Sequence, residues 1–302
     1  MKILITDGIS EAGAKMLQDA GHEVVQQKLS PEELLQQIGD YEAILVRSAT
    51  KVRQDVIDAG SKLKVIGRGG VGLDNIDVAY AESKGIAVLN TPGASSISVA
   101  ELAIAHMFAA SRFVHISNVE MRKGEWPKKA YSKGVELTGK TLGLFGLGNI
   151  GKETAKRALG LGMKVIAFDP IVKETDMNVT LMSKDEVLAQ ADYISLHIPF
   201  LKEQGASIRA EEFAKMKDGV ILVNCARGGV VVEKDLLDAL NSGKVRAAGI
   251  DVYENEPVTE AQAELVNHPN VSVTPHIGAS TVEGQGRVGL EIAERVIEAL
   301  KS

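Results

Sequence analysis

Short apolar segments alternate with helix-like segments along the whole chain. The apolar segments have the length of strands and are rich in Val, Ile and Leu. They cover residues 2–6, 23–25, 43–46, 63–67, 86–89, 142–145, 165–168, 193–198, 220–224, 245–250 and 271–274. The segments between them, such as 31–38 and 76–84, have helical composition. This alternation predicts an α/β protein with doubly wound parallel sheets.

Two longer segments are also predicted to be helical. Residues 96–122 are rich in alanine and indicate one long helix or a pair of helices. Near the end of the chain, Ser280 and Glu283 have the spacing of a capping box, which predicts that a helix begins there. Apolar residues at Val288, Ile292 and Val296 would give that helix one buried face.

Gly146, Gly148 and Gly151 form the most specific pattern in the chain. An apolar segment precedes them, and a helical segment and a second apolar segment follow, ending in Asp169, 21 residues beyond Gly148. In a dinucleotide-binding fold the glycines let backbone N–H groups approach a pyrophosphate, the helix N-terminus attracts it, and the acid accepts hydrogen bonds from ribose hydroxyls. The alternative interpretation is a glycine-rich structural turn.

A second glycine pattern is set aside. Residues 134–141 match the Walker A pattern, which requires a strand before it and a helix after it. Here a predicted strand follows, so we do not expect a P-loop.

Composition narrows the class of protein and of partner. The 302 residues suffice for about two domains, and 45% hydrophobic and 25% charged residues are ordinary for a globular protein. A net charge of −6 without a long basic run argues against a nucleic-acid partner. We expect no membrane span or signal peptide, and no metal, because no ligand cluster has suitable spacing. A single cysteine excludes an intrachain disulfide and predicts a cytoplasmic protein.

Three polar residues follow predicted strands in the second half of the chain: Arg227, Glu256 and His276. The carboxyl ends of parallel strands share one edge of a sheet, so these residues can converge. Histidine can exchange a hydroxyl proton near neutral pH, a glutamate can hold its imidazole, and arginine can bind a carboxylate. This chemistry suits hydride transfer at a hydroxyl-bearing carbon.

Each of the three has an alternative interpretation. His276 could be a capping or core histidine, Arg227 a surface ion pair and Glu256 an ordinary loop carboxylate. His197, which follows another strand, is the rival base, and Cys225 is either a nucleophile or inert packing. The remaining histidines are interpreted as structural: His22, His106, His115 and His268.

Five segments together resemble one family, the D-isomer-specific 2-hydroxyacid dehydrogenases: residues 67–77, 90–93, 224–229, 251–257 and 274–280. The resemblance runs in order over nearly the whole chain. Within the family, residues 46–50 and 224–227 are most similar to the branch that oxidises 3-phospho-D-glycerate at the start of phosphorylated serine synthesis.

The resemblance implies roles for many residues. The catalytic trio would be Arg227, Glu256 and His276. The NAD site would comprise Val71, Gly146, Gly148, Asn149, Ile150, Gly151, Asp169, Ile198, Cys225, Ala226, Asp251, Gly278 and Ala279. The substrate would meet Arg47, Ser48, Arg68, Gly69 and Gly70.

The resemblance also implies the organisation of the chain. Residues 1–92 and 283–302 would form a flavodoxin-like substrate domain, and residues 93–282 a Rossmann-type NAD domain, with a cleft between them. The long helical region and an arm carrying Trp126 would build a homodimer.

Charged residues bear on which cofactor and which substrate are expected. Asp169 would repel a 2′-phosphate and no arginine follows it closely, which favours NAD over NADP. Arg47 and Arg68 could bind a substrate phosphate, or they could serve only surface solubility.

Three departures from the family pattern bear on function. The chain ends after the last helix, at Ser302, so we expect no serine-sensing regulatory domain and no feedback inhibition through one. Ser95 replaces an asparagine of several relatives, and residues 200–204 replace a threonine-rich turn. The alternative functions are a glyoxylate, hydroxypyruvate or other D-2-hydroxyacid reductase and, from another class, an NAD-sensing corepressor.

Overall fold

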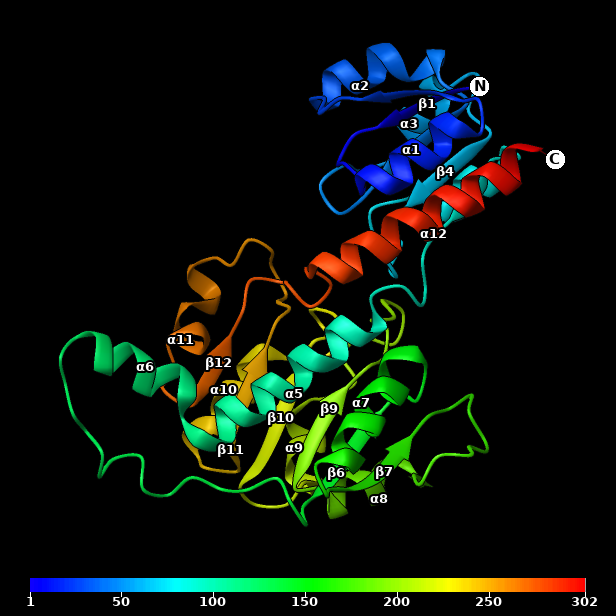
Figure 1. Ribbon diagram of the computed structural model, residues 1–302. Coiled ribbons are helices and arrows are strands. Elements are labelled where there is room, and N and C mark those ends of the chain that lie inside the picture. The colour runs from blue at the N-terminus through cyan, green and yellow to red at the C-terminus, as the bar shows by residue number, and fades with distance from the viewer. Residues whose placement is uncertain (302) are drawn as a thin grey trace. The chain divides into compact units, whose positions relative to one another are not determined.

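The structure is a computed structural model that describes residues 1–301. The chain divides into two compact units (Figure 1). The terminal unit combines residues 1–96 with the segment that begins at Ala279, and the central unit is Ile97–Gly278. The boundaries expected from the sequence, after residues 92 and 282, lie four residues from these.

Within the described residues, the terminal unit contains a five-stranded parallel sheet in the order β2-β1-β3-β4-β5. Its strands are β1 (Lys2–Ile5), β2 (Glu23–Gln26), β3 (Ala43–Val46), β4 (Val65–Arg68) and β5 (Ala87–Leu89). Both faces of the sheet are buried: Leu4 belongs to one apolar cluster, while Ile3 and Ile5 belong to the other. Burial on both faces explains why the strands are continuous apolar runs.

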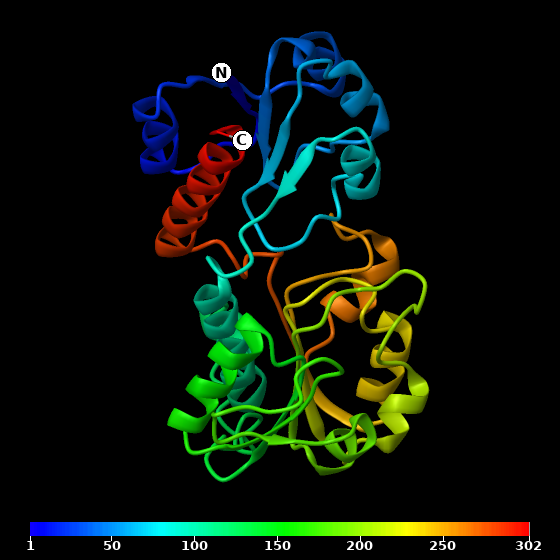
Figure 2. The same ribbon diagram turned by 90° about the vertical axis from the view of Figure 1, so that its right-hand side faces the viewer.

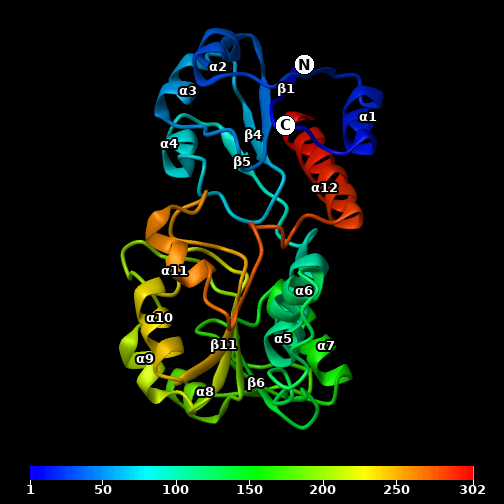
Figure 3. The same ribbon diagram turned by 90° about the vertical axis from the view of Figure 1, so that its left-hand side faces the viewer.

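Helices cover both faces of this sheet (Figure 3). On one side lie α1 (Glu11–Asp19) and α12 (Val282–Lys301); on the other lie α2 (Pro31–Gln37), the short η1 (Ile38–Asp40), α3 (Gln54–Ala59) and α4 (Val78–Ser83). Glycines let α1 and α12 approach closely, because a Cβ atom on Gly13 would lie 2.3 Å from the carbonyl oxygen of Gly289. The buried face expected for the last helix is confirmed at Val288, Ile292 and Val296.

The cap expected for that helix is wrong by one residue. The hydroxyl of Thr281, and not that of Ser280, accepts the hydrogen bond from the backbone N–H of Gly284 at 2.9 Å. The helix therefore begins at Val282, and Glu283 lies in its first turn.

The central unit contains, among the described residues, a seven-stranded parallel sheet in the order β12-β11-β10-β9-β6-β7-β8. Its strands are β6 (Thr141–Phe145), β7 (Lys164–Phe168), β8 (Thr180–Leu181), β9 (Tyr193–Leu196), β10 (Val220–Asn224), β11 (Val245–Ile250) and β12 (Val271–Val273). The order of the strands reverses between β6 and β9. In open parallel sheets ligands bind beyond the carboxyl ends of the strands at such a point.

Helices cover both faces of this second sheet as well (Figure 2). The helices α5 (Ser96–Arg112) and α7 (Asn149–Gly160) pack on one face. The other face is covered by α8 (Lys184–Gln190), α9 (Ala210–Lys215), α10 (Glu233–Asn241), the short η2 (Glu260–Gln262) and α11 (Ala263–Val266). The expected α/β class with two doubly wound parallel sheets is confirmed.

The long alanine-rich segment is a pair of helices. Phe113 has a left-handed backbone, with φ of 57°, and separates α5 from α6 (Val114–Arg122). In the described part of the chain, no single helix is long and apolar enough to cross a membrane; α5 and α6 reach that length only together, across a bend of 67°.

Candidate active site

The three glycines after β6 each serve a different purpose. Gly146 has φ of 95°, and a Cβ atom there would lie 2.5 Å from the carbonyl oxygen of His197. A Cβ atom on Gly151 would lie 2.2 Å from the carbonyl oxygen of Gly146, so only glycine lets α7 pack this close to the strand end. A Cβ atom on Gly148 would meet no described atom within 4 Å. The loop therefore presents bare backbone on its exposed side, as a bound pyrophosphate requires.

The N-terminus of α7 completes this loop. Gly148 is its N-cap and, having no side chain, makes no side-chain cap to the first N–H groups. These groups and the positive end of the helix dipole suit a phosphate. Asn149 and Ile150 are the first two residues of this helix. The predicted dinucleotide loop thus has the geometry that such a loop needs.

Asp169 lies at the end of β7, beside the loop. Its Oδ2 accepts a hydrogen bond from the Leu147 N–H at 2.7 Å, and its Oδ1 accepts from Ile171 at 2.8 Å and Val172 at 3.0 Å. Partial burial raises the pKa of Asp169, but these three bonds outweigh burial and lower its pKa overall. A carboxylate has about four acceptor positions, so one remains for a ribose hydroxyl.

Arg227 follows β10 on a turn that Asn224 holds in shape. The Asn224 side-chain oxygen accepts from the Ala226 N–H at 3.1 Å, and its NH₂ donates to the Arg227 carbonyl at 3.1 Å. The Arg227 guanidinium donates to the Ala226 carbonyl at 2.7 Å. The adjoining Cys225 and Ala226 are buried. Burial raises the pKa of the Cys225 thiol well above its ordinary value, which favours packing over nucleophilic chemistry.

Glu256 and His276 form a direct pair. The His276 Nδ1 lies 2.7 Å from the Glu256 Oε2, and the two side chains are 46% and 37% exposed. The other oxygen of Glu256 accepts from the Tyr253 N–H at 3.1 Å. Partial burial raises the pKa of Glu256, but the bonds from His276 and Tyr253 and the charge of Arg227 outweigh it and lower that pKa. The carboxylate is therefore ionised and holds the imidazole by one nitrogen.

His197, the rival base, lies in a different environment. Its Nε2 contacts the Ser195 hydroxyl at 3.1 Å, and its buried Nδ1 has no hydrogen-bond partner among the described residues. Burial lowers the pKa of His197 to about 4. With no carboxylate to stabilise its protonated form, this histidine is unsuited to general-base work near neutral pH.

The other expected cofactor residues fall into both units. In the central unit, Ile198 follows β9, Asp251 is buried directly after β11, and a Cβ atom on Gly278 would lie 3.0 Å from an Asp251 oxygen. Val71 and Ala279 belong to the terminal unit. There the Val71 carbonyl accepts from the Asn90 side chain at 2.6 Å.

The expected substrate residues follow β3 and β4 of the terminal unit. Arg47 and Ser48 come directly after β3, Arg68 is the last residue of β4, and Gly69 and Gly70 follow it. The Arg68 Nε donates to the Arg47 carbonyl at 3.4 Å, which brings the two arginines together.

Asp7 orders the loop that carries Arg47. Its Oδ2 accepts from the N–H groups of Arg47 at 2.7 Å and Thr50 at 3.0 Å, and its Oδ1 accepts from the Thr50 hydroxyl at 2.6 Å. The guanidinium itself is half-buried, and burial lowers the pKa of Arg47 although Asp7 opposes this. Its buried Nε has no acceptor among the described residues. A half-buried cation with an unused donor is suited to an anion.

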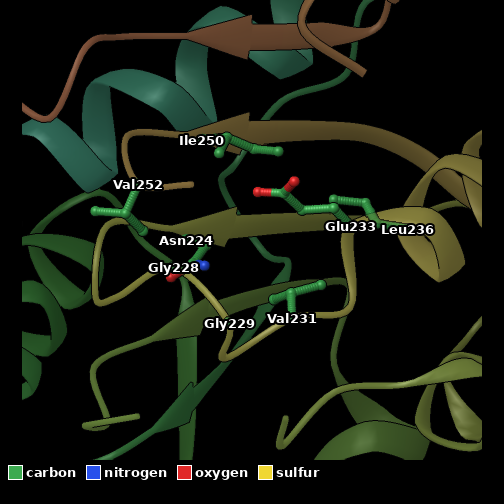
Figure 4. A pocket seen from close by; sticks show the side chains of 8 residues that line it. All are labelled: Asn224, Gly228, Gly229, Val231, Glu233, Leu236, Ile250 and Val252. Atoms are coloured by element: carbon green, nitrogen blue, oxygen red, sulfur yellow. The ribbon is translucent and has the colours of Figure 1, made fainter. Parts of the chain in front are cut away.

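One pair of hydrogen bonds at the loop that carries Glu256 was not predicted from the sequence. The Glu233 carboxylate accepts from the Glu254 N–H at 2.7 Å, and the Glu254 carboxylate accepts from the Glu233 N–H at 3.1 Å. Figure 4 shows the Glu233 carboxylate in a small hollow beside Ile250 and Asn224. Burial, then the charges of Glu254 and Glu256, raise the pKa of Glu233. This pair joins the start of α10 to the loop that carries Glu256, over a separation that no local pattern reveals.

Comparison with known proteins gives concordant matches. The family model described as D-isomer specific 2-hydroxyacid dehydrogenase, NAD binding domain, matches residues 104–278. A hydroxypyruvate reductase of Thermotoga maritima is 49% identical over 99% of this chain and 98% of its own length. A D-3-phosphoglycerate dehydrogenase of Methanocaldococcus jannaschii is 47% identical over 100% of this chain, which spans 58% of that relative's length.

The solved structures agree with these sequence matches. The crystal structure of a glyoxylate reductase from Paecilomyes thermophila is 35% identical, with a TM-score of 0.90, and the match covers 100% of this chain and 96% of that one.

Proposed function

Because the chain belongs to the D-isomer specific 2-hydroxyacid dehydrogenases and carries their NAD-binding domain, we propose that it oxidises 3-phospho-D-glycerate to 3-phosphohydroxypyruvate with NAD. The observation that carries the chemistry is the contact of 2.7 Å between His276 and Glu256. The observation that favours a phosphorylated substrate is the half-buried Arg47 with its unused Nε. The reaction would be the first step of phosphorylated serine synthesis.

In the proposed mechanism, Arg227 binds the substrate carboxylate with its planar guanidinium. Bound NAD supplies the acceptor for the hydride that leaves C2. The Nε2 of His276 takes the proton of the C2 hydroxyl, since its Nδ1 is already held by Glu256. The Glu256 carboxylate stabilises the imidazolium that results. In the reverse direction His276 returns the proton to the carbonyl oxygen.

The substrate phosphate would bind to the terminal unit. Arg47 and Arg68 supply positive charge, and Ser48 with the backbone of Gly69 and Gly70 supplies further donors. The contact of the Arg68 Nε with the Arg47 carbonyl supports a shared anion site.

A second candidate, hydroxypyruvate reduction, is favoured by one observation. The T. maritima hydroxypyruvate reductase matches this chain over 98% of its own length. Its named substrate differs from 3-phosphohydroxypyruvate by the phosphate alone. The two candidates therefore share the catalytic trio and differ in whether Arg47 and Arg68 contribute to binding.

The test compares NADH oxidation with 3-phosphohydroxypyruvate, hydroxypyruvate and glyoxylate by kcat/KM. The first candidate requires a strong preference for the phosphorylated substrate, and Arg47→Gln should lower kcat/KM for it at least tenfold while sparing hydroxypyruvate. Equal or better turnover of the unphosphorylated acids would overturn it in favour of the second candidate.

We also propose that the protein is a cytoplasmic homodimer. The supporting observation is a set of exposed apolar side chains on α5, α6 and the arm after them: Phe108, Val114, Val119, Met121 and Trp126. Trp126 is 75% exposed, and such a set commonly marks an interface. Light scattering after size-exclusion chromatography should give twice the chain mass, and a monomer at micromolar concentration would contradict the proposal.

A further inference from the structure

His106 belongs to a buried hydrogen-bond chain that ends beside the active site. It lies on α5 and is 2% exposed. Its Nδ1 lies 3.0 Å from the Ser272 hydroxyl, and its Nε2 lies 3.0 Å from the Thr274 hydroxyl. The approach depends on Gly249 of β11, where a Cβ atom would lie 2.4 Å from the His106 Cβ. The side chain thus reaches across β11 to the middle residue of β12 and to the residue that follows the strand.

The direction of each hydrogen bond in this chain can be assigned. The Thr274 hydroxyl donates to the Asp251 Oδ1 at 2.6 Å, and a carboxylate only accepts. Thr274 has one hydroxyl proton, so its oxygen must accept from the His106 Nε2–H. The Nδ1 is then the acceptor of a hydrogen bond that the Ser272 hydroxyl donates. Burial lowers the pKa of His106 to about 4, which keeps the ring neutral and this single tautomer in place.

Asp251 also accepts hydrogen bonds from the backbone that follows His276. Its Oδ1 also accepts from the Ile277 N–H at 2.8 Å, and its Oδ2 accepts from the Gly278 N–H at 2.9 Å. These two N–H groups directly follow His276, whose backbone is left-handed with φ of 52°. Asp251 is 1% exposed, so the orientation of its carboxylate depends on its few partners.

We propose that His106 is a positioning residue that acts through Thr274 on the Asp251 carboxylate and the Ile277–Gly278 backbone. Without the Nε2–H donor, Thr274 can turn its hydroxyl to other acceptors, and Asp251 loses its shortest hydrogen bond. The segment that follows His276 then loses its fixed position. The inference rests on the proposed function in one respect, because it takes Asp251 and Gly278 as part of the NAD site.

Two matched variants test the direction of the chain. In His106→Gln the side-chain NH₂ can donate near the position of Nε2, whereas in His106→Asn the shorter amide reaches only toward Ser272. Both are uncharged, so a merely structural role predicts that both lower Tm without separating in NADH affinity. We expect the Kd for NADH, measured by NADH fluorescence, to stay within about twofold for Gln and to rise about tenfold for Asn. Equal Kd values for the two variants would overturn the inference.

A second pair keeps the test independent of whether the His106 variants fold. Thr274→Ser retains the hydroxyl, and Thr274→Val removes it at nearly constant volume. Serine should preserve the Kd for NADH and valine should raise it about tenfold; equal values would again overturn the inference.

Asp251→Asn separates this inference from the proposed function. If Asp251→Asn leaves the Kd unchanged, the placement of Asp251 in the NAD site is wrong and the inference falls with it. If Asp251→Asn weakens NADH binding while His106→Asn and Thr274→Val do not, only the inference is overturned.

Discussion

Two histidines near β12 show how hydrogen-bond partners decide what the same side chain can do. His276 follows the strand, is 46% exposed, and is held by a carboxylate at 2.7 Å. His106 faces the strand from α5, is buried, and its two ring nitrogens bond to hydroxyl groups at 3.0 Å. A carboxylate bonded to the ring stabilises the protonated form, whereas at His106 burial outweighs the charge of Asp251 and keeps the ring neutral. His276 can therefore exchange a proton during a reaction, whereas the neutral His106 can hold Thr274 and Asp251 in position.

The largest effect should come from removing His276. In His276→Gln the general base is lost, and kcat/KM should fall roughly 10²–10⁴-fold. Because the side chain is half-exposed and contributes little to the core, Tm should change by no more than a few degrees. Steady-state NADH oxidation measures the fall in kcat/KM, and thermal unfolding measures the change in Tm. A fall in kcat/KM of less than tenfold would show that the general base is another residue.

Removing the charge of Glu256 should have the next largest effect. A hydrogen bond to a charged group contributes about 1.5–3 kcal/mol, so Glu256→Gln should lower kcat roughly ten- to hundredfold. Glu260→Gln makes the same change of charge on the exposed residue four positions further on and serves as the control. Equal rates for the two variants would remove Glu256 from the mechanism.

The sequence predicted the sheets well and their smaller features less well. The segments expected at 43–46, 220–224 and 245–250 agree with β3, β10 and β11 at both ends, because strands buried on both faces are unbroken apolar runs. In contrast, β8 was missed, since its two residues carry no periodic pattern. Strand-end residues were expected at one edge because parallel topology requires it.

What the sequence could not reveal are contacts between distant residues. From the sequence, His106 is expected to be structural, because no partner lies near it in the chain. Its partner Ser272 is 166 positions away, and Thr274 is 168 positions away. The reciprocal bonds of Glu233 and Glu254 span 21 positions and likewise follow no local spacing. Such pairs become visible only once the strands are ordered in the sheet.

The buried histidines should make the protein sensitive to acid. The pKa values of His106 and His197 are lowered from 6.5 to about 4 in the folded state. Between these two pKa values the unfolded chain binds more protons than the folded chain. The stability that the two neutral histidines contribute is therefore complete above pH 6.5 and is lost as the pH falls toward 4. Each pKa unit corresponds to about 1.4 kcal/mol. Chemical denaturation at pH 7.5 and 5 should show a smaller loss for His106→Gln than for the wild type; identical losses would contradict the assignment.

The smallest effect expected is that of Ser272→Ala. The hydroxyl of Ser272 donates to the His106 Nδ1, and its loss leaves a buried acceptor unsatisfied, which costs about 1–3 kcal/mol. Thr274 and Asp251 keep their hydrogen bonds, since the Nε2 side of the ring is untouched. Chemical denaturation should therefore detect a loss of stability while the Kd for NADH stays within about twofold. A larger rise in Kd would mean that both ring nitrogens position the active site, and the contrast between the two ends of the imidazole would disappear.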